Sequence, residues 1–279
     1  LYDMGLLLSV NTNGSMINEK AIEKWRKRPP SRVNITLYGA SDATYEALCG
    51  ARGVCSKVKG AVLAMKKAGL IVKLNCSLTH YNAPDLKEMV QFAGDNGVQI
   101  TVSTYMYPPV RRDATMTGQN DRFTPRDAAW YHMQRSRYQK GEEAYVQYLK
   151  NILHGMTEPP GLDEECVDPT NGRIRCRAGT AAFWATWDGY MTPCGMMPEP
   201  KLDLNGFSFR DAWKKLVEIS TGLHTSSVCE NCANQSMCHS CAAMAYAETG
   251  TTSGIPLYLC EMTHAMIQIA QEELLSLSG

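Results

Sequence analysis

The sequence predicts an α/β fold: an incomplete parallel β/α barrel over residues 1–108, followed by a small cysteine-rich α+β domain over residues 166–279. Two observations lead to this prediction. Apolar runs alternate with helical patterns in the first part, which is typical of βαβ units and a parallel sheet. Only three of the eleven cysteines lie in that part, and the others begin at Cys166.

Composition narrows the classes of partner. The 279 residues suffice for one large domain or two ordinary ones, and 44% hydrophobic and 20% charged residues are typical of a globular chain. Lys plus Arg equals Asp plus Glu at 28 each, so no net field attracts nucleic acid or an acidic membrane. The apolar runs are too short to span a bilayer. We therefore expect neither a nucleic-acid nor a membrane partner.

Four apolar, partly β-branched runs predict the strands of the first part. They lie at residues 6–10, 33–38, 71–78 and 99–105. Three helical patterns separate them: one from Asn18 to about Lys27, one over residues 57–67, and one from Pro84 to near Gly97. Proline at a helix start and glycine just after its end suit those positions. Four strands of this kind favour a barrel that is not closed.

Residues 109–165 interrupt the alternation. Thr124 and Pro125 begin a long helical stretch that reaches about Ile152, and the prolines at 159 and 160 end it. We interpret this segment as a helical connector.

Short elements follow from residue 166. Residues 183–194 predict a hairpin, with Asp188 and Gly189 as a two-residue turn. Ser208 is a candidate N-cap for a helix to about Ser220, and an amphipathic helix over residues 258–275 closes the chain.

The first residues of the chain, LYDMGLLLSVNTNG, resemble a strand running into a turn rather than a signal peptide or an ordinary start. We therefore expect a chain truncated at its N-terminus.

The segment CENCANQSMCHSC at 229–241 carries Cys229, Cys232, Cys238 and Cys241. A core role suits Cys49, Cys55 and Cys76, which lie singly in the first part of the chain, but it does not suit the polar neighbours of this segment. Disulfides do not suit an odd total or such short spacings. Paired CxxC motifs are common in zinc sites, although a dozen or more residues usually separate the pairs. Iron–sulfur clusters accept a compact run of thiolates completed by remote cysteines. Cys166, Cys176, Cys194 and Cys260 make two four-thiolate sites possible, so zinc and iron–sulfur interpretations both remain.

A family resemblance favours iron–sulfur. CRAGTAAFWATWDGYMTPC, CENCANQSMCHSC and Cys260 resemble the SPASM domain, the auxiliary-cluster region of many radical S-adenosylmethionine (SAM) enzymes. NTNG at 11–14, ITLYGASDATYEALCG at 35–50 and the segment 53–82 resemble successive strand–helix units of the radical SAM partial barrel. Together they cover nearly the whole chain.

The resemblance implies a ligand assignment for two auxiliary 4Fe–4S clusters. One set is Cys229, Cys232, Cys238 and Cys260; the other is Cys166, Cys176, Cys194 and Cys241. Eight protein thiolates would ligate both clusters fully, which favours an electron-relay or structural role over substrate binding. Sulfatase-maturing relatives place an Asp directly after the cysteine that follows the hairpin, where this chain has Gly195.

The resemblance also implies a SAM site. Thr36 stands where the family often has Ser or Thr near the ribose, Asn13 lies in the turn after the first strand, and Asn75 lies on the third. Each also suits a residue that bonds nearby backbone. The CxxxCxxC motif of the SAM-cleaving primary cluster is absent from these residues. We expect it before residue 1, and expect residues 1–279 alone not to cleave SAM.

The implied function is that of a radical SAM oxidoreductase that modifies a peptide or small protein by radical hydrogen abstraction. In such enzymes an electron splits SAM into methionine and a 5′-deoxyadenosyl radical. An electron donor such as ferredoxin or flavodoxin and a reducing cytoplasm follow from this chemistry. Two alternatives remain: a non-catalytic iron–sulfur electron-transfer or scaffold protein, and a zinc-binding interaction module.

Overall fold

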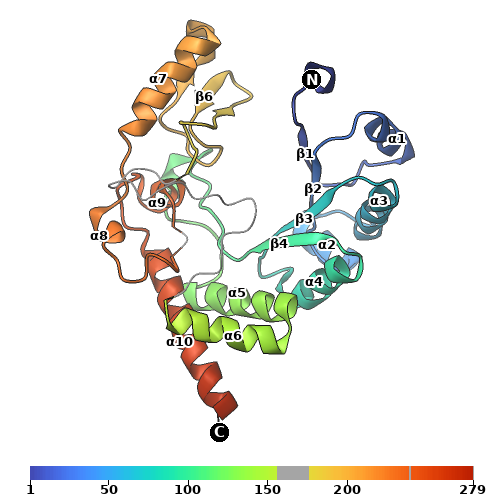
Figure 1. Cartoon of the computed structure of the whole chain (residues 1–279), viewed down its shortest axis with the longest axis vertical. Helices are drawn as coiled ribbons and strands as arrows, with labels where there is room; N and C mark the ends of the chain where they lie inside the picture. The colour runs from blue at the N-terminus through green and yellow to red at the C-terminus, as the bar shows by residue number, and fades with distance from the viewer. Residues whose placement is uncertain (156–175, 239, 279) are drawn as a thin grey trace. The chain divides into compact units, whose positions relative to one another are not determined.

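The computed structural model describes residues 1–155, 176–238 and 240–278. They form two compact units (Figure 1). The first comprises Leu1–Met106 and Arg122–Tyr145, and the second comprises Tyr107–Asp121 and Val146–Gly279. The expected boundaries were at residues 108 and 165. Residues 109–121 and 146–155 of the expected connector belong to the second unit, and residues 122–145 belong to the first. Residues 156–165 of the connector lie outside the described residues.

A four-stranded parallel sheet forms the centre of the first unit, in the order β1-β2-β3-β4. The strands are β1 (Ser9–Thr12), β2 (Arg32–Thr36), β3 (Val72–Ser77) and β4 (Gln99–Ser103). The connections contain α1 (Glu19–Lys27), α2 (Asp42–Cys49), α3 (Cys55–Lys67) and α4 (Leu86–Asp95). The predicted parallel α/β fold is confirmed.

Helix ends follow local side-chain chemistry. The Asn18 side chain accepts a hydrogen bond from the Ala21 N–H group, which confirms the predicted start of α1. Helix α2 was not predicted. Its N-cap is Ser41 and its last turn ends at Gly50 with φ of 65°. Only eight residues long, α2 gives too short a window for its periodicity to stand out.

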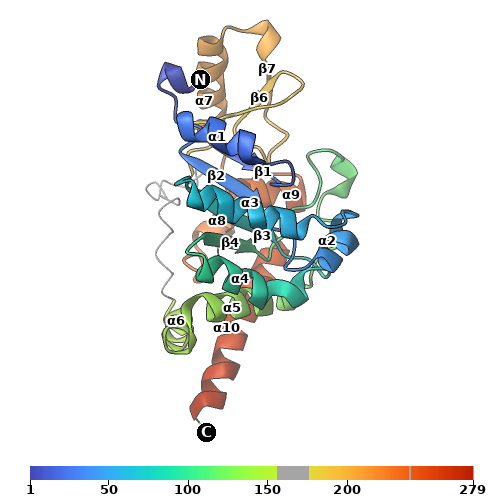
Figure 2. The same ribbon diagram turned by 90° about the vertical axis from the view of Figure 1, so that its right-hand side faces the viewer.

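Helices α1, α3 and α4 lie on one face of the sheet (Figures 1 and 2). On β2, β3 and β4 the residues of that face are apolar and buried, among them Val33, Ile35, Leu74 and Val102. They alternate along each strand with residues of the opposite face, as the pleat requires. The core of this unit therefore lies on one face of the sheet.

Helix α5 (Pro125–Lys140) covers the outer edge of β4. The Gln139 Nε2 atom donates to the Ile100 carbonyl over 3.0 Å, and the Arg135 Nη1 atom donates to the Val102 carbonyl over 3.3 Å. Side chains thus occupy carbonyls that another strand would use. The single helix predicted up to Ile152 is wrong, because Gly141, with φ of 78°, separates α5 from α6 (Glu142–Leu153).

In the second unit, β5 (Trp184–Ala185), β6 (Tyr190–Thr192) and β7 (Leu202–Asp203) form an antiparallel sheet. Its core consists of Met191, Leu202, Ala212 and Leu216, where α7 (Phe209–Thr221) packs on the sheet. The predicted cap of α7 is confirmed, since the Ser208 side chain accepts from the Asp211 N–H group.

The hairpin differs from the predicted two-residue turn. The Thr186 N–H group donates to the Tyr190 carbonyl over 2.8 Å, so three residues lie between this pair. Gly189 has φ of 89° and its N–H group donates to the Thr186 carbonyl. A turn closed by a left-handed glycine is the usual three-residue form. Gly189 was therefore identified correctly, but the loop is longer.

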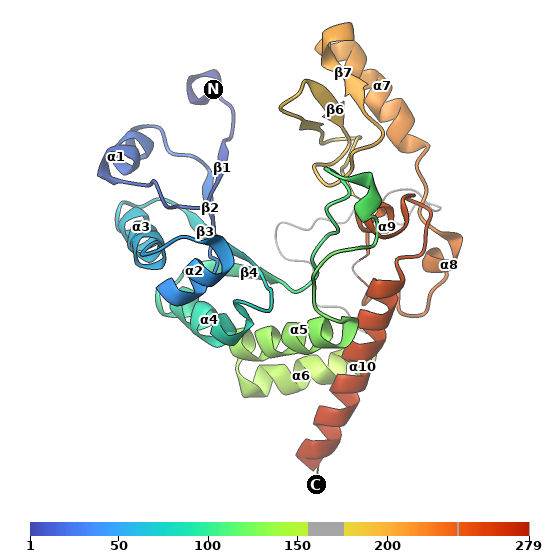
Figure 3. The ribbon, with the colours of Figure 1, turned by 180° about the vertical axis from the view of Figure 1, so that it is seen from behind.

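Beyond α7, the described residues of the second unit contain three helices (Figure 3). They are α8 (Ser227–Glu230), α9 (Ala242–Thr249) and α10 (Leu257–Ser278). The predicted final helix is confirmed, with a longer extent. Short 3-10 segments lie at Tyr2–Met4, Ala83–Asp85, Ala114–Met116 and Leu204–Gly206. Among the described helices, none has the length and apolar character that crossing a bilayer requires.

The close packing after β2 leads to a stability prediction. A Cβ atom on Gly39 would lie 2.5 Å from the Cγ2 atom of Thr44, so we expect Gly39→Ala to lower the free energy of unfolding by about 1–3 kcal/mol. A Cβ atom on Gly60, within α3, would meet no other atom, and Gly60→Ala should raise the free energy of unfolding by up to about 1 kcal/mol. Urea unfolding followed by circular dichroism measures both. Substitutions that shift stability in the same direction would contradict this packing.

Candidate functional site

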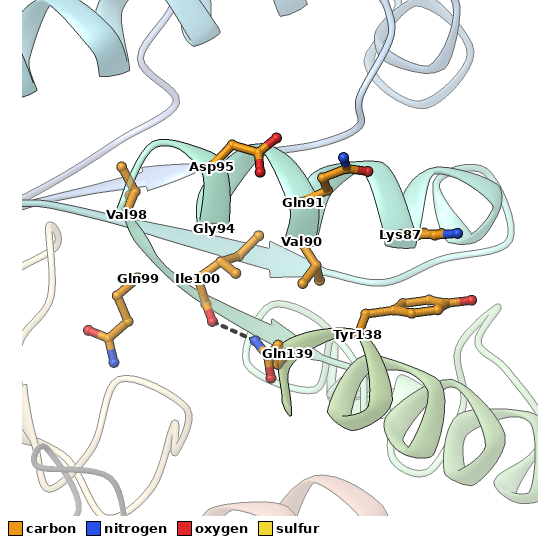
Figure 4. Close-up of a pocket in the computed structure, with 10 residues that line it drawn as sticks. All are labelled: Lys87, Val90, Gln91, Gly94, Asp95, Val98, Gln99, Ile100, Tyr138 and Gln139. Atoms are coloured by element: carbon orange, nitrogen blue, oxygen red, sulfur yellow. Dashed lines mark hydrogen bonds between the residues drawn. The ribbon is translucent and has the colours of Figure 1, made fainter. Parts of the chain in front are cut away.

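A surface pocket of about 530 Å³ lies between α4, the start of β4 and the end of α5 (Figure 4). Its lining includes Lys87, Asp95, Gln99 and Tyr138. Gln99 is the first residue of β4, so the pocket is at the amino end of that strand. Parallel sheets bind ligands at the carboxyl ends of their strands. The pocket is therefore not the candidate site.

The face of the sheet opposite the helices is polar. Its residues are Ser9, Asn11, Arg32, Asn34, Thr36, Lys73, Asn75, Ser77, Gln99, Thr101 and Ser103, all exposed or half-buried. The Asn34 Nδ2 atom donates to the Asn11 Oδ1 atom over 2.8 Å. Parallel sheets are normally apolar on both faces because both are covered. A polar second face therefore suits a polar ligand rather than a core.

Strand register places the predicted SAM contacts in one row. Thr36 pairs with Asn75, and Asn75 pairs with Thr101, which sequence reasoning missed. Neighbouring strands lie about 4.8 Å apart, so these side chains are adjacent. Thr12 of β1 pairs with Ile35 of β2. The next residues along the chain are Asn13 and Thr36, so Asn13 is level with Thr36. The row contains hydroxyl and amide groups near the carboxyl ends of the strands.

Asn13 already has local partners. Its Oδ1 atom accepts from the Ser15 N–H group over 3.1 Å and from the Ser15 hydroxyl over 2.9 Å. This is the backbone-bonding role that the sequence left open for Asn13. A SAM contact by Asn13, Thr36 or Asn75 remains a prediction.

The loop after β2 is held by side chains from two other segments. The Ala40 N–H group donates to the Asp85 Oδ2 atom over 2.6 Å, and the Lys59 Nζ atom donates to the Ala40 carbonyl over 2.7 Å. The Tyr38 N–H group donates to the Tyr45 hydroxyl over 3.2 Å. The backbone beyond Thr36 is thus fixed on both sides, which orients the end of β2.

Asn82 joins the ends of β2 and β3. Its fully buried side chain donates to the carbonyls of Tyr38 and Ser77, over 3.1 Å and 3.2 Å, and accepts from the Thr79 N–H group over 2.7 Å. Sequence reasoning missed Asn82 and Asp85. In the sequence, their position beside Pro84 indicated only a helix start. In the structure, the buried amide of Asn82 has partners at the ends of two strands and so fixes the edge of the site.

The first group of cysteines lies around the start of α10. Burial raises the pKa of the Cys260 thiol, and the negative charges of Cys238, Cys229 and Cys232 raise it further. Burial likewise raises the pKa of Cys229, which the Ser226 hydroxyl opposes by hydrogen bonding, while Cys238 and Cys232 add to the rise. Four thiols from α8, its following loop and α10 are therefore electrostatic neighbours.

The second group consists of Cys176, Cys194 and Cys241. Burial raises the pKa of the Cys176 thiol, the Ala178 N–H group opposes this by hydrogen bonding, and Cys241 and Cys194 raise it again. Cys194 follows the hairpin, and Cys241 is the N-cap residue of α9. Cys166, the remaining predicted ligand, lies outside the described residues.

Hydrogen-bond donors contact the thiols of the second group. The Met196 N–H group donates to the Cys194 Sγ atom over 3.4 Å, and the Tyr107 hydroxyl lies 3.8 Å from the Cys241 Sγ atom. Such donors are typical of the surroundings of thiolate ligands. In the described ranges, no three His, Cys, Asp or Glu side chains are arranged to hold a single metal ion.

The loop that carries Cys194 packs on an aromatic ring. The Arg111 Nη1 atom donates to the Gly195 carbonyl, and the Arg111 guanidinium lies 5.8 Å from the centre of the Trp184 ring. A Cβ atom at Gly195 would lie 3.0 Å from that ring. A side chain at this position would therefore be tight against Trp184, and the partly exposed ring would have to shift by a few tenths of an ångström.

The three remaining cysteines belong to the first unit. Cys55 and Cys76 are buried, which confirms their interpretation as core residues, and burial raises the pKa of the Cys76 thiol to about 12. For Cys49 that interpretation is wrong, because the residue is exposed at the end of α2.

Comparison with known proteins identifies homologues. No protein-family model matches the chain. The chain is 22% identical over 261 residues to an AdoMet-dependent heme synthase of Methanosarcina barkeri, covering 89% of this chain and 72% of that protein. It is 27% identical over 191 residues to a probable GTP 3′,8-cyclase of Aeropyrum pernix, covering 67% and 50%.

Solved structures show the same fold. The anSMEcpe protein with bound AdoMet and the Cp18Cys peptide aligns with a TM-score of 0.66 at 16% identity, covering 96% of this chain and 75% of that one. Streptococcus suis SuiB bound to the precursor peptide SuiA aligns with a TM-score of 0.62 at 15% identity, covering 93% and 60%. The α/β fold with its parallel sheet is thus similar to that of radical SAM enzymes, and the homologues are enzymes of that kind.

Thiol accessibility tests the placement of the three outlying cysteines. In the native protein we expect iodoacetamide to modify Cys49, whereas Cys55 and Cys76 stay unmodified because both are buried and Cys76 forms almost no thiolate near pH 8. Peptide mass spectrometry gives the rates, with urea-unfolded protein as the control in which all three react. Modification of native Cys76 as fast as Cys49 would contradict the assignment.

Proposed function

We propose that this chain is part of a radical SAM enzyme in which the second unit holds two auxiliary 4Fe–4S clusters and the polar sheet face holds SAM. The observation that carries the proposal is the division of the thiols. Cys260 has Cys229, Cys232 and Cys238 as electrostatic neighbours, whereas the neighbours of Cys176 are Cys194 and Cys241.

The thiols suit iron–sulfur clusters in number and kind. The first group supplies four thiolates, and the second supplies three, to which the sequence adds Cys166. Thiolates that lie together repel one another, and binding to iron offsets that repulsion. Such clusters transfer single electrons. The chain's own part is to hold the thiolates and to donate hydrogen bonds to them, from Ser226 to Cys229 and from Met196 to Cys194.

For SAM we propose the row of Thr36, Asn75 and Thr101. Hydroxyl and amide groups at the carboxyl ends of parallel strands suit the ribose hydroxyls of a nucleoside. When reduced by one electron, SAM bound there would supply the radical that abstracts hydrogen. Asp85 and Lys59 fix the loop beyond Thr36, so that the row keeps its orientation.

A peptide or small protein is the proposed substrate class, with a ferredoxin or flavodoxin as electron donor in a reducing cytoplasm. Two structural neighbours support the peptide: anSMEcpe with the Cp18Cys peptide and SuiB with its precursor SuiA. The sequence relatives named as AdoMet-dependent heme synthases favour a second candidate, a heme precursor. Isothermal titration calorimetry of the chain with each candidate substrate distinguishes the two by which one binds.

Removal of single ligands tests the division of the thiols. After anaerobic reconstitution we expect about eight irons per chain, and about four in both Cys260→Ala and Cys176→Ala because each loses one cluster. Cys49→Ala is the matched control and should retain the full content. Iron and sulfide assays give the number, and electron paramagnetic resonance should show a different remaining cluster in each variant. Loss of the same cluster from both variants would contradict the assignment, and zinc in place of iron would support an interaction module.

The SAM site is tested by Thr36→Val, which keeps the side-chain shape and removes the hydroxyl. We expect SAM affinity to fall by about tenfold, the equivalent of one hydrogen bond of about 1.4 kcal/mol. Thr252→Val, in the second unit, is the control and should bind as the wild type does. Isothermal titration calorimetry measures the affinities. Equal affinity of Thr36→Val and wild type, or no binding by the wild type, would count against the site.

A further inference from the structure

Tyr107 contacts a proposed cluster ligand. It belongs to the second unit, and its hydroxyl lies 3.8 Å from the Sγ atom of Cys241 across 134 positions of sequence. The backbone of Tyr107 is held as well, since its carbonyl accepts from the Asn120 Nδ2 atom over 3.0 Å. The half-buried ring is thus placed by its own segment, with its hydroxyl at the thiol.

The direction of this hydrogen bond follows from the chemistry of the sulfur. A cysteine bound to iron is a thiolate, which has no proton to donate. The hydroxyl of a tyrosine carries a proton that it can donate. With a cluster present, Tyr107 is therefore the donor and Cys241 the acceptor.

We propose that Tyr107 is a positioning residue that raises the reduction potential of the cluster held by Cys176, Cys194 and Cys241. The inference rests on the proposed function. Reduction adds negative charge that is shared with the thiolate sulfurs, and a hydrogen bond to sulfur stabilises the more negative state. The donor therefore favours electron uptake by this cluster.

The two cysteine groups differ in the side chains that contact them. The Ser226 hydroxyl bonds to Cys229 in the first group, whereas the Tyr107 hydroxyl bonds to Cys241 in the second. Ala178 and Met196 contribute backbone N–H groups, which a substitution leaves in place. Tyr107→Phe therefore removes one donor and changes one cluster.

Redox titration of the anaerobically reconstituted chain, followed by electron paramagnetic resonance, tests the proposal. In Tyr107→Phe we expect the ratio of reduced to oxidised cluster at a fixed potential to fall three- to tenfold for one of the two clusters, a downward shift of roughly 30–60 mV for one electron. The cluster affected must be the one that Cys176→Ala lacks, and the potential of the other must stay unchanged. Tyr246→Phe, a partly buried tyrosine on α9, is the control and should shift neither.

A second readout compares the wild type with the variant. Electron–nuclear double resonance of the reduced wild-type cluster should show a strongly coupled proton that exchanges in D₂O, in addition to the N–H protons of Ala178 and Met196, and this proton should be missing in Tyr107→Phe. Absence of that proton, or an unchanged potential in Tyr107→Phe, overturns the inference while the clusters stand. Failure of the wild type to form any iron–sulfur signal overturns the proposed function and the inference together.

Discussion

The cost of forming thiolates at buried, neighbouring cysteines is the constraint on which metal binding by the second unit would depend. Burial is the largest cause that raises the pKa of Cys176, Cys229 and Cys260, and the charges of neighbouring cysteines raise it further. A bound cation would offset this cost, and metal binding would then stabilise the folded state. The small core around Met191 and Leu216 and the short helices α8 and α9 suit a unit whose loops are ordered around metal clusters.

The first unit has a different constraint. One face of its parallel sheet is polar, so apolar packing on the other face and hydrogen bonds at the strand ends must keep the sheet ordered. Its buried face packs against α1, α3 and α4, and side chains of α5 occupy the outer edge of β4. Asn82, Asp85 and Lys59 then fix the strand ends by hydrogen bonds to backbone. The position of the polar row of Thr36, Asn75 and Thr101 therefore depends on these three residues, which lie outside the row.

The sequence predicted the features that local patterns encode. Caps at Asn18, Thr124 and Ser208 indicated helix starts, and apolar runs located the parallel strands, although the first run, at 6–10, shares only two residues with β1. Helix α2 and the break at Gly141 were missed because a short amphipathic segment and an isolated glycine give weak signals. Contacts such as Asn82 with Tyr38 or Tyr107 with Cys241 could not be predicted, since they depend on how distant segments pack. The cysteines were found because their crowding is visible in the sequence, whereas their grouping came only from family resemblance.

Mössbauer spectroscopy of the wild-type chain, reconstituted anaerobically with ⁵⁷Fe and sulfide, tests the central claim most directly, because it identifies the kind of cluster and counts the iron in each. The account predicts that nearly all bound iron belongs to 4Fe–4S clusters, at two clusters per chain. Iron bound as mononuclear or 2Fe–2S centres, or protein that takes up zinc and excludes iron, would contradict it.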